Sequence, residues 1–235
     1  MLELFPHGFE EVDHPDGVEL VAYTDPSGEE RLWHAFSGSG VSAGKAVADG
    51  WEDRWRDFHH PVRVGSVWIG QPWQERPRDA VVVVIEPGRA FGTGAHATTR
   101  LCLELIAGLE RGSLLDVGCG SGVLAIAAAK LGFTPVVALD IDEQAVAVAR
   151  ANAEANGVDL ELRVADAVDD ALPAADVAVA NITRAVAEAA GARIECRTLI
   201  TSGYLEADEV RLPHFEWAQR LTADGWAADL HLRRE

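Results

Sequence analysis

Residues 114–122 read L-L-D-V-G-C-G-S-G and set the fold class of this chain. The first four residues are a short apolar run typical of a buried strand. The glycines that follow let the backbone turn sharply and pass close to a bound group, just before an apolar helix predicted over 123–132. A strand, a glycine-rich turn and a helix in this order indicate one unit of a parallel α/β sheet with a ligand at the turn.

Strands and helices alternate on both sides of this turn. Upstream, the β-branched run 80–86 leads into another glycine-rich turn, P-G-R-A-F-G-T-G-A-H-A-T-T-R (87–100), and into a helix predicted over 98–109. In chain order 87–100 is the first glycine-rich turn and 118–122 is the second. Downstream, the apolar pattern predicts strands at 135–140, 160–166, 175–181 and 197–205, a helix over 143–157 and a closing hairpin. Near-continuous apolar strands of this kind predict an α/β fold with a doubly wound, mostly parallel, Rossmann-like sheet.

The N-terminal part of the chain lacks the regular alternation of strands and helices. Short strand-like segments and a helix predicted over 43–58 indicate a small α+β domain over residues 1–75, and the proline-containing run before the β-branched segment indicates a linker over 76–85. The remaining residues, 86–235, form the main domain. Four of the seven tryptophans lie between Trp51 and Trp73. They could form a recognition surface, but we favour a buried core because large aromatic side chains mostly bury.

Composition narrows the class of protein. Hydrophobic residues make up 48% of the 235 residues, and the formal net charge is -18. Such an acidic chain is not expected to bind nucleic acid, because phosphates need clusters of Lys and Arg. The charge favours a basic protein partner, or it only supports solubility. No run is long and apolar enough for a membrane helix, and no secretory signal is visible.

The three cysteines have no metal-type spacing and predict reduced thiols in the cytoplasm. His59 and His60 lack a third ligand, so we expect no metal site. We also expect a monomer.

Distinctive polar residues fall at the carboxyl ends of the predicted strands, where such sheets bind ligands. The first strand ends in the spacing D-x-G-x-G-x-G, which is neither the dinucleotide pattern G-x-G-x-x-G nor a phosphate loop with its lysine. Asp140, at the end of the second predicted strand, can accept hydrogen bonds from both hydroxyls of a ribose. It could instead cap the helix that follows, although Asp142 is also placed for that role. Together these residues predict a pocket for a nucleoside without phosphate, such as S-adenosylmethionine; they are Asp116, Gly118, Gly120, Asp140, Asp166 and Asn181.

The segments F-G-T-G-A-H-A-T-T-R-L-C-L-E, L-L-D-V-G-C-G-S-G-V-L-A-I-A-A-A-K-L-G, A-L-D-I-D-E-Q-A-V and V-A-N-I together resemble the ribosomal protein L11 methyltransferase family. The resemblance covers roughly 86–203, and the first segment is its most specific element. It implies a class I methyltransferase sheet that transfers methyl groups from S-adenosylmethionine to protein amines and releases S-adenosylhomocysteine. By the same resemblance, Phe91 and Thr99 contact the donor from the first glycine-rich turn, Gly118 approaches its methionine part, Asp140 its ribose, and Asn181 the reacting centre. His96 is either catalytic or a structural residue beside a helix start.

An amine must be neutral and aligned with the S–CH3 bond to accept a methyl group. We expect the side-chain amide of Asn181 and a nearby backbone carbonyl to hold it there. Two departures from the family pattern bear on the acceptor: N-I-T-R stands where the family has N-I-L-A, so that Arg184 could alter the acceptor entrance, and the N-terminal region is shorter. Alternatives stay open: another protein lysine or a small metabolite as acceptor, a non-catalytic donor-binding module, or a nicotinamide-dependent oxidoreductase.

Overall fold

The computed structural model describes residues 10–14, 17–21, 60–86 and 94–234. The chain divides into two compact units, Met1–Asp57 and Phe58–Glu235. In the first unit, β1 (Glu10–His14) and β2 (Gly17–Val21) form an antiparallel hairpin. The helix predicted over 43–58 lies outside the described residues. So do Trp51 and Trp55, whereas Trp68 is buried and Trp73 is exposed.

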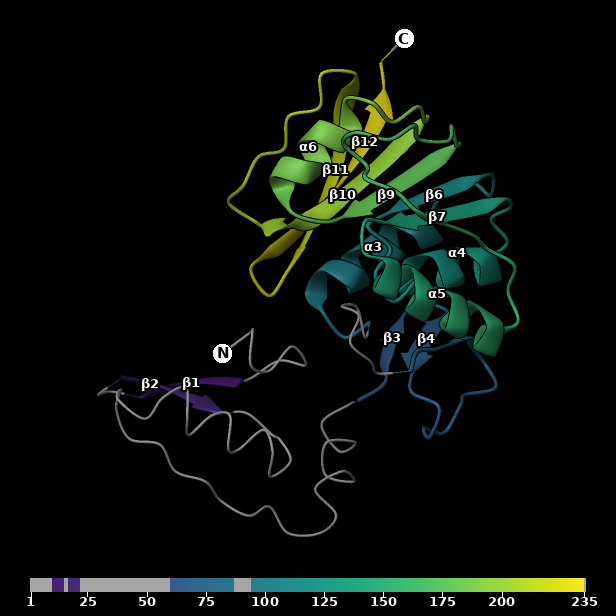
Figure 1. Cartoon of the computed structure of the whole chain (residues 1–235), viewed down its shortest axis with the longest axis vertical. Coiled ribbons are helices and arrows are strands. Elements are labelled where there is room, and N and C mark those ends of the chain that lie inside the picture. Colours follow the sequence, from purple (N-terminus) through teal and green to yellow (C-terminus); the bar gives the residue numbers. More distant parts are fainter. Residues whose placement is uncertain (1–9, 15–16, 22–59, 87–93, 235) are drawn as a thin grey trace. The chain divides into compact units, whose positions relative to one another are not determined.

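The second unit is built on a seven-stranded sheet with the spatial order β11-β12-β10-β9-β6-β7-β8 (Figure 1). The strands from β6 to β10 run parallel, and β12 runs antiparallel to both β10 and β11. The order reverses between β6 and β9, as in doubly wound sheets. The predicted α/β sheet with its closing hairpin is thus confirmed; its strands are β6 (Leu114–Val117), β7 (Val136–Asp140), β8 (Glu161–Val164), β9 (Val177–Asn181), β10 (Thr198–Leu205), β11 (Phe215–Ala223) and β12 (Trp226–Arg233).

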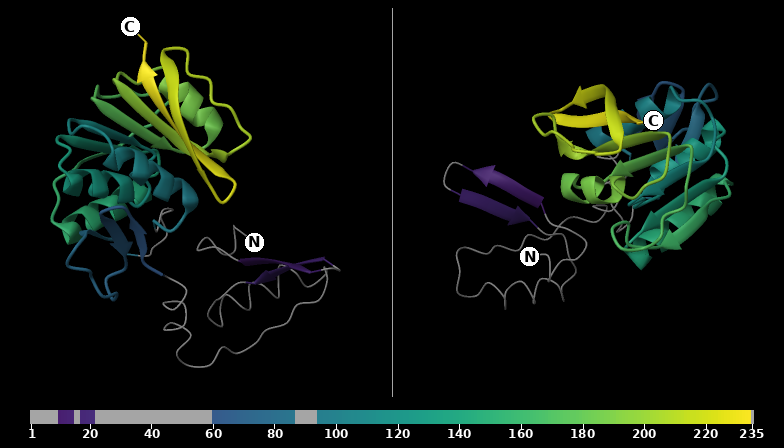
Figure 2. Two further views of the ribbon diagram at one scale, coloured as in Figure 1. Left: turned by 180° about the vertical axis from the view of Figure 1, so that it is seen from behind. Right: turned by 90° about the horizontal axis from the view of Figure 1, so that it is seen from above.

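Helices cover both faces of this sheet (Figures 1 and 2). One face packs against α3 (Ala97–Ala107), α4 (Val123–Leu131) and α5 (Glu143–Asn156), and the other against α6 (Arg184–Gly191). Successive residues of β9 serve the two cores in turn: Val177 and Val179 face the three helices, while Ala178 and Ala180 face α6. Burial on both faces explains why the inner parallel strands β6, β7 and β9 are almost continuously apolar, whereas the edge strand β8, which reads E-L-R-V, is mostly exposed.

A three-stranded sheet packs against α4 and α5 in the same unit. It consists of β3 (Val62–Val64), β4 (Val67–Gly70) and β5 (Val81–Val84), with β3 antiparallel and β5 parallel to β4. Ile69 and Val83 belong to the core shared with α3 and α4. The segment predicted as a linker, 76–85, therefore contains a strand, because its β-branched run pairs with β4. The domain boundary expected at residue 75 lies inside the second compact unit; how much of the chain folds independently remains a prediction.

Local capping signals position most helix ends. Asp142 accepts a hydrogen bond from the Gln144 amide at the start of α5, and the helix ends at Gly157 in the left-handed conformation. Gly132 closes α4 in the same way. The short helix α6 has no acidic residue in its first turn and no basic residue in its last, so its own signals are weak and the sequence pattern does not predict it.

Candidate functional site

The carboxyl ends of β6, β7 and β9 bring the predicted site residues to one edge of the sheet. The glycine-rich turn 118–122 follows β6, Asp140 ends β7, and Asn181 ends β9. Because β6 lies between β7 and β9, these three features are neighbours in space as well as in the predicted order. The switch point of the sheet, β6 beside β9, is where open α/β sheets bind ligands.

Asp140 fixes the glycine-rich turn. Its Oδ2 accepts a hydrogen bond of 2.9 Å from the amide of Gly120, and its Oδ1 accepts one of 3.0 Å from the amide of Asp142. The cap of α5 is Asp142, so Asp140 is not the helix cap that was its alternative role. A carboxylate can accept more than two hydrogen bonds, so both oxygens retain capacity for a ligand hydroxyl.

Two glycines clamp the chain just after Asn181. A Cβ on Gly118 would lie 2.3 Å from Cγ2 of Ile182, and a Cβ on Gly203 would lie 2.1 Å from the carbonyl oxygen of the same residue. Both glycines have left-handed backbones, with φ of 71° and 99°. The Ile182 amide also donates to the Ser202 carbonyl at 3.1 Å. The segment that carries Asn181 is therefore held from both neighbouring strands, and Asn181 itself remains partly exposed.

Gly203 and Ile182 hold the segment that carries Asn181 in the candidate site, and sequence reasoning did not single them out. A glycine inside a strand pattern is a known signal of a β-bulge or a close backbone approach, and Gly203 lies at a register shift between β10 and β12. That signal could have found Gly203. The signal could not have indicated that Gly203 contacts Ile182, because the two residues belong to different strand segments that only the fold brings together.

Asp116 lies beneath the turn. It is 1% exposed, and its Oδ2 accepts a hydrogen bond of 3.1 Å from the amide of Ala125 in the first turn of α4. Burial raises the pKa of this carboxyl to about 7, and the charge of Asp140 adds to that rise. This structural role is compatible with the predicted donor contact, which stays a prediction.

Asp166 follows β8 at the same edge. Its Oδ1 accepts from the amide of Val168 at 2.7 Å, and its own amide donates to Asp170 Oδ2 at 2.9 Å. These bonds fix a tight turn beside the end of β7, since β7 and β8 are paired. The place of Asp166 in the predicted nucleoside pocket stays a prediction.

The first glycine-rich turn is described only at its ends. Phe91 lies outside the described residues, while Thr99 is buried in the first turn of α3. His96 caps that helix: its Nδ1 accepts from the Thr98 amide at 3.4 Å, and its ring packs edge-on against Trp226 with the ring centroids 4.8 Å apart. The structural alternative for His96 therefore has direct support.

Among the described residues, no group of three or more His, Cys, Asp or Glu side chains could hold a metal ion. Within the same ranges, no helix is both long and apolar enough to span a membrane.

Comparison with known proteins identifies the family. The model of the ribosomal protein L11 methyltransferase (PrmA) family matches residues 30–229. The chain belongs to this family. The L11 methyltransferase of Salmonella arizonae is 49% identical over 138 residues, which is 56% of this chain and 47% of that protein. That of Shewanella pealeana is 42% identical over 181 residues, 71% of this chain and 61% of that protein. The chain thus spans about half to three fifths of the length of these relatives.

A solved family structure has the same fold. The ribosomal protein L11 methylase of Lactobacillus delbrueckii subsp. bulgaricus superposes with a TM-score of 0.63 and 28% identity, covering 75% of this chain and 100% of that one. The family resemblance stated from the sequence is confirmed.

Proposed function

We propose that this chain transfers methyl groups from S-adenosylmethionine to amino groups of a protein, and that ribosomal protein L11 is the protein. The observation that carries the proposal is the edge formed by β6, β7 and β9, where a glycine-rich turn, a carboxylate and a side-chain amide converge in a chain of this family. The names of the relatives support the substrate. Family membership favours methyl transfer over a nicotinamide-dependent oxidation.

The residues present fit a nucleoside donor. Asp140 keeps hydrogen-bonding capacity beside a turn that its carboxylate already orders. Gly118 and Gly120 carry no side chain that would separate a bound group from the backbone. We assign Asp140 to the ribose and Gly118 with Gly120 to the methionine part of the donor. Thr99, Phe91, Asp116 and Asp166 complete the proposed donor site.

When bound, S-adenosylmethionine would supply a methyl group on its sulfonium sulfur to the lone pair of the acceptor amine, leaving a neutral thioether, and the methylated ammonium would then release a proton to solvent. The acceptor amine must therefore arrive neutral, although a lysine amine has a pKa of about 10.4 and an α-amine about 7.7–8.0 in water. A site that excludes water lowers such a pKa, because it disfavours the charged form. The Asn181 side-chain oxygen and a neighbouring backbone carbonyl accept hydrogen bonds from the amine and orient its lone pair. The close packing of Gly118 and Gly203 against Ile182 fixes the backbone next to Asn181, from which its side chain extends.

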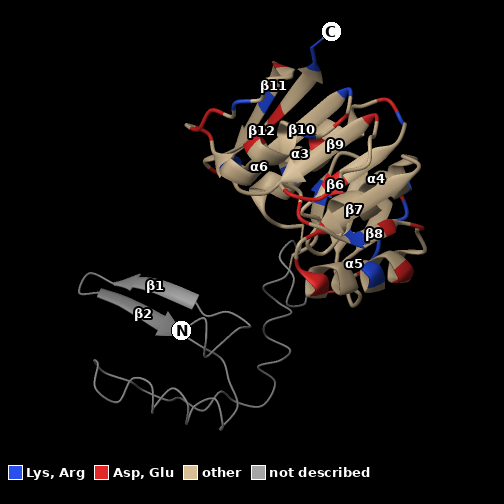
Figure 3. Cartoon of the chain, turned by 45° about the horizontal axis from the view of Figure 1, so that its top comes forward, with Lys and Arg blue, Asp and Glu red and all other residues tan. Residues whose placement is uncertain are grey.

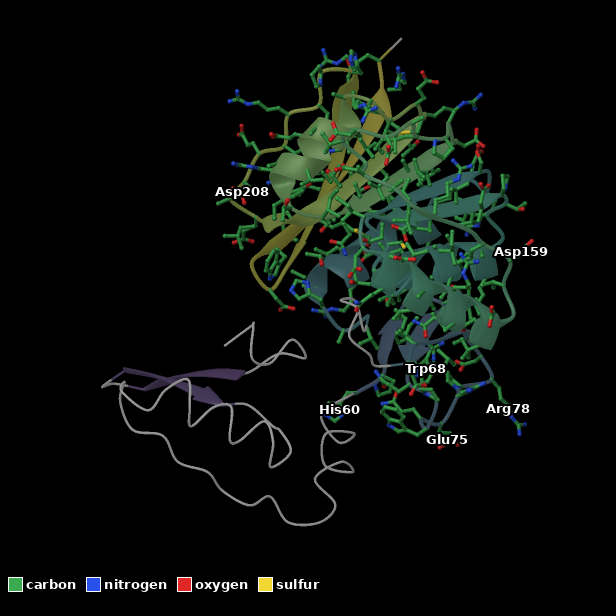
Figure 4. All side chains as sticks on the ribbon, viewed as in Figure 1. His60, Trp68, Glu75, Arg78, Asp159 and Asp208 are labelled. Atoms are coloured by element: carbon green, nitrogen blue, oxygen red, sulfur yellow. The ribbon has the colours of Figure 1, made fainter. Side chains whose placement is uncertain are left out.

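Arg184 modifies the acceptor side in this proposal. Its Nη1 lies 3.1 Å from Oδ1 of Asp208, in the loop beyond the end of β10 (Figure 4). The Asp208 carboxylate also accepts from the Leu205 amide at 3.1 Å. Arg184 is thus held at the start of α6, close in sequence to Asn181, where it adds a positive charge that the family pattern lacks.

The formal charge of -18 supports a basic protein as partner rather than nucleic acid or an acidic membrane. In the view of Figure 3, acidic and basic residues are interspersed over the larger unit. All three cysteines are free and buried, as suits a reducing compartment, and we propose that the chain works in the cytoplasm as a monomer.

The test of the function is transfer of labelled methyl from S-adenosylmethionine to purified ribosomal protein L11, followed by intact and peptide mass. Mass gains of one or more methyl units on lysines or the α-amine are expected. If L11 gains no mass while S-adenosylhomocysteine still binds, the donor site stands and the acceptor becomes another protein lysine or a metabolite. If no acceptor is methylated at all, the chain is a donor-binding module.

Asn181→Ala tests the proposed catalytic group. Losing one positioning hydrogen bond in the reacting complex is expected to lower kcat by about 100-fold, with the donor Kd changed less than about threefold. Steady-state kinetics and calorimetric binding of S-adenosylhomocysteine separate the two effects. Loss of donor binding with turnover reduced only in proportion would show that Asn181 belongs to the donor pocket alone.

A further inference from the structure

Two asparagines on one face of α5 connect segments that are far apart in sequence. Asn152 and Asn156 are one helical turn apart, and Asn152 is 2% exposed. Buried amides with several hydrogen bonds are costly to leave unpaired and therefore fix the groups they bind.

Asn156 binds the free edge of β5 as a neighbouring strand would. Its Oδ1 accepts from the Val84 amide at 2.9 Å, and its Nδ2 donates to the Val84 carbonyl at 2.6 Å. Both contacts go to one residue of the small sheet. Asn156 thus fastens that sheet to α5.

Asn152 joins two different segments. Its Oδ1 accepts from the amide of Glu86, the last described residue before the first glycine-rich turn, at 3.1 Å. Its Nδ2 donates to the carbonyl of Ser121, inside the second glycine-rich turn, at 2.9 Å. One buried side chain therefore links the segment before the first turn to the second turn itself.

Close packing supports the link. A Cβ on Gly122 would lie 3.1 Å from Cβ of Ala149, one helical turn before Asn152, so α5 rests directly on the second turn. Gly94, in the described part of the first turn, is also tightly packed: a Cβ there would lie 2.7 Å from Cγ2 of Ile69. Asn152 is therefore the side chain that joins Glu86 to Ser121 directly, through one hydrogen bond to each.

We propose that Asn152 is a positioning residue of the donor site, which keeps the chain entering the first glycine-rich turn in register with the second turn. The inference rests on the proposed function only in that the pocket binds S-adenosylmethionine. Without Asn152, the Glu86 amide and the Ser121 carbonyl lose their shared partner together. The second turn then keeps its hydrogen bonds to Leu139 and Asp140 at the end of β7 but loses the one that joins it to a side chain of α5. Asn156 has no such link to the second turn, so it supports the fold without setting the donor site.

The experiment compares Asn152→Ala with the matched control Asn156→Ala in the full chain. Both variants lose an amide on the same face of α5, and both are expected to lower the Tm. Only Asn152→Ala is expected to weaken binding of S-adenosylhomocysteine, by about tenfold or more in Kd by calorimetry, and to raise KM for the donor more than it lowers kcat. Equal Kd values for the two variants would overturn the proposal.

Asn152→Asp isolates the link to the second turn. A carboxylate can still accept from the Glu86 amide but cannot donate to the Ser121 carbonyl. It is expected to weaken donor binding as Asn152→Ala does, whereas Asn156→Asp leaves it within about twofold of the wild type. Wild-type Kd values for Asn152→Asp would overturn the proposal.

A wild-type measurement covers the case in which the Asn152 variants do not fold. S-adenosylhomocysteine should slow amide exchange in peptides covering Val81–Glu86 as well as in those covering the second turn. Protection of the second turn alone would contradict the proposed register. If the wild type does not bind S-adenosylhomocysteine, it is the proposed function that fails.

Discussion

Asp116, at the glycine-turn edge, and Asp229, in the C-terminal hairpin, are both 1% exposed, yet their surroundings favour opposite charge states. Asp116 accepts a backbone hydrogen bond from Ala125 and has a pKa raised to about 7, because burial penalises its charge. Burial also raises the pKa of Asp229, but hydrogen bonds from Arg220, Tyr204 and Trp217 outweigh it and hold that pKa below its usual value.

The geometry of the hairpin explains the difference. Arg220 binds Asp229 with two parallel hydrogen bonds, Nε to Oδ1 at 2.8 Å and Nη2 to Oδ2 at 2.7 Å. Tyr204 and Trp217 add donors at 2.8 and 3.0 Å. Depth of burial alone therefore does not set the charge of a carboxylate. A buried ion pair orders the hairpin, whereas backbone contacts and short side chains order the glycine-turn edge.

The largest effect is expected from Asp229→Ala. The substitution leaves Arg220 and Tyr204 without their shared acceptor, so the free energy of unfolding should fall by about 3–5 kcal/mol in urea denaturation. Asp79→Ala is the control: it removes an exposed ion pair with Arg63 and should leave the unfolding midpoint unchanged. A variant as stable as this control would mean that the hairpin network contributes no more than a surface pair.

Gly203→Ala tests the close contact between β10, which pairs with the C-terminal hairpin, and Ile182, beside Asn181 at the glycine-turn edge. The added Cβ meets the Ile182 backbone in a left-handed conformation, so a loss of about 2–4 kcal/mol is expected, together with loss of methyl transfer. Gly157→Ala shares the left-handed backbone but meets nothing within 4 Å, and should cost only about 1–2 kcal/mol. Chemical denaturation of both variants measures the difference. Equal losses of stability in the two variants would show that the Ile182 backbone can move away from the added Cβ at little cost.

Asp116→Asn separates charge from burial at the glycine-turn edge. The folded pKa of Asp116 is about 7 against an ordinary value of 3.8, so its protonation stabilises the fold fully below pH 3.8 and that stabilisation is lost as the pH rises to about 7. The wild type should therefore lose stability relative to the Asp116→Asn variant across this window, by roughly 1 kcal/mol per pH unit, because the variant carries no titrating group at this position. Urea denaturation of both proteins from pH 4 to 8 measures the difference, and parallel curves would contradict a buried neutral Asp116.

Arg184→Ala is expected to have the smallest effect. Its ion pair with Asp208 is half exposed, so stability should change by about 0–1 kcal/mol. Removing a positive charge near the acceptor should lower KM for a basic protein acceptor about two- to fivefold at low salt, and less at high salt. The donor Kd is the internal control. An unchanged acceptor KM at every salt concentration would place Arg184 outside the acceptor path.

Local patterns are sufficient to predict much of the fold and of the candidate site. The apolar runs, the glycine caps at 132 and 157 and the D-x-G-x-G-x-G turn each act over a few residues, so they are legible without the rest of the chain. Parallel strands place their carboxyl ends at one edge, which is why Asp140 and Asn181 can be assigned to one site before their neighbours are known. The predicted linker 76–85 contains β5 (Val81–Val84), whose partner β4 is identifiable only through pairing.

The sequence by itself determined the strand and helix alternation, the glycine-rich turn and the identity of the polar residues at the strand ends, since these follow from side-chain periodicity and backbone freedom. Only the tertiary structure decided that β12 lies between β10 and β11, that Asn152 joins Glu86 to Ser121, and that Asp229 rather than Asp116 receives a cation. These features depend on hydrogen bonds and charges brought together from distant parts of the chain, and their strength is set by burial that no local pattern reveals.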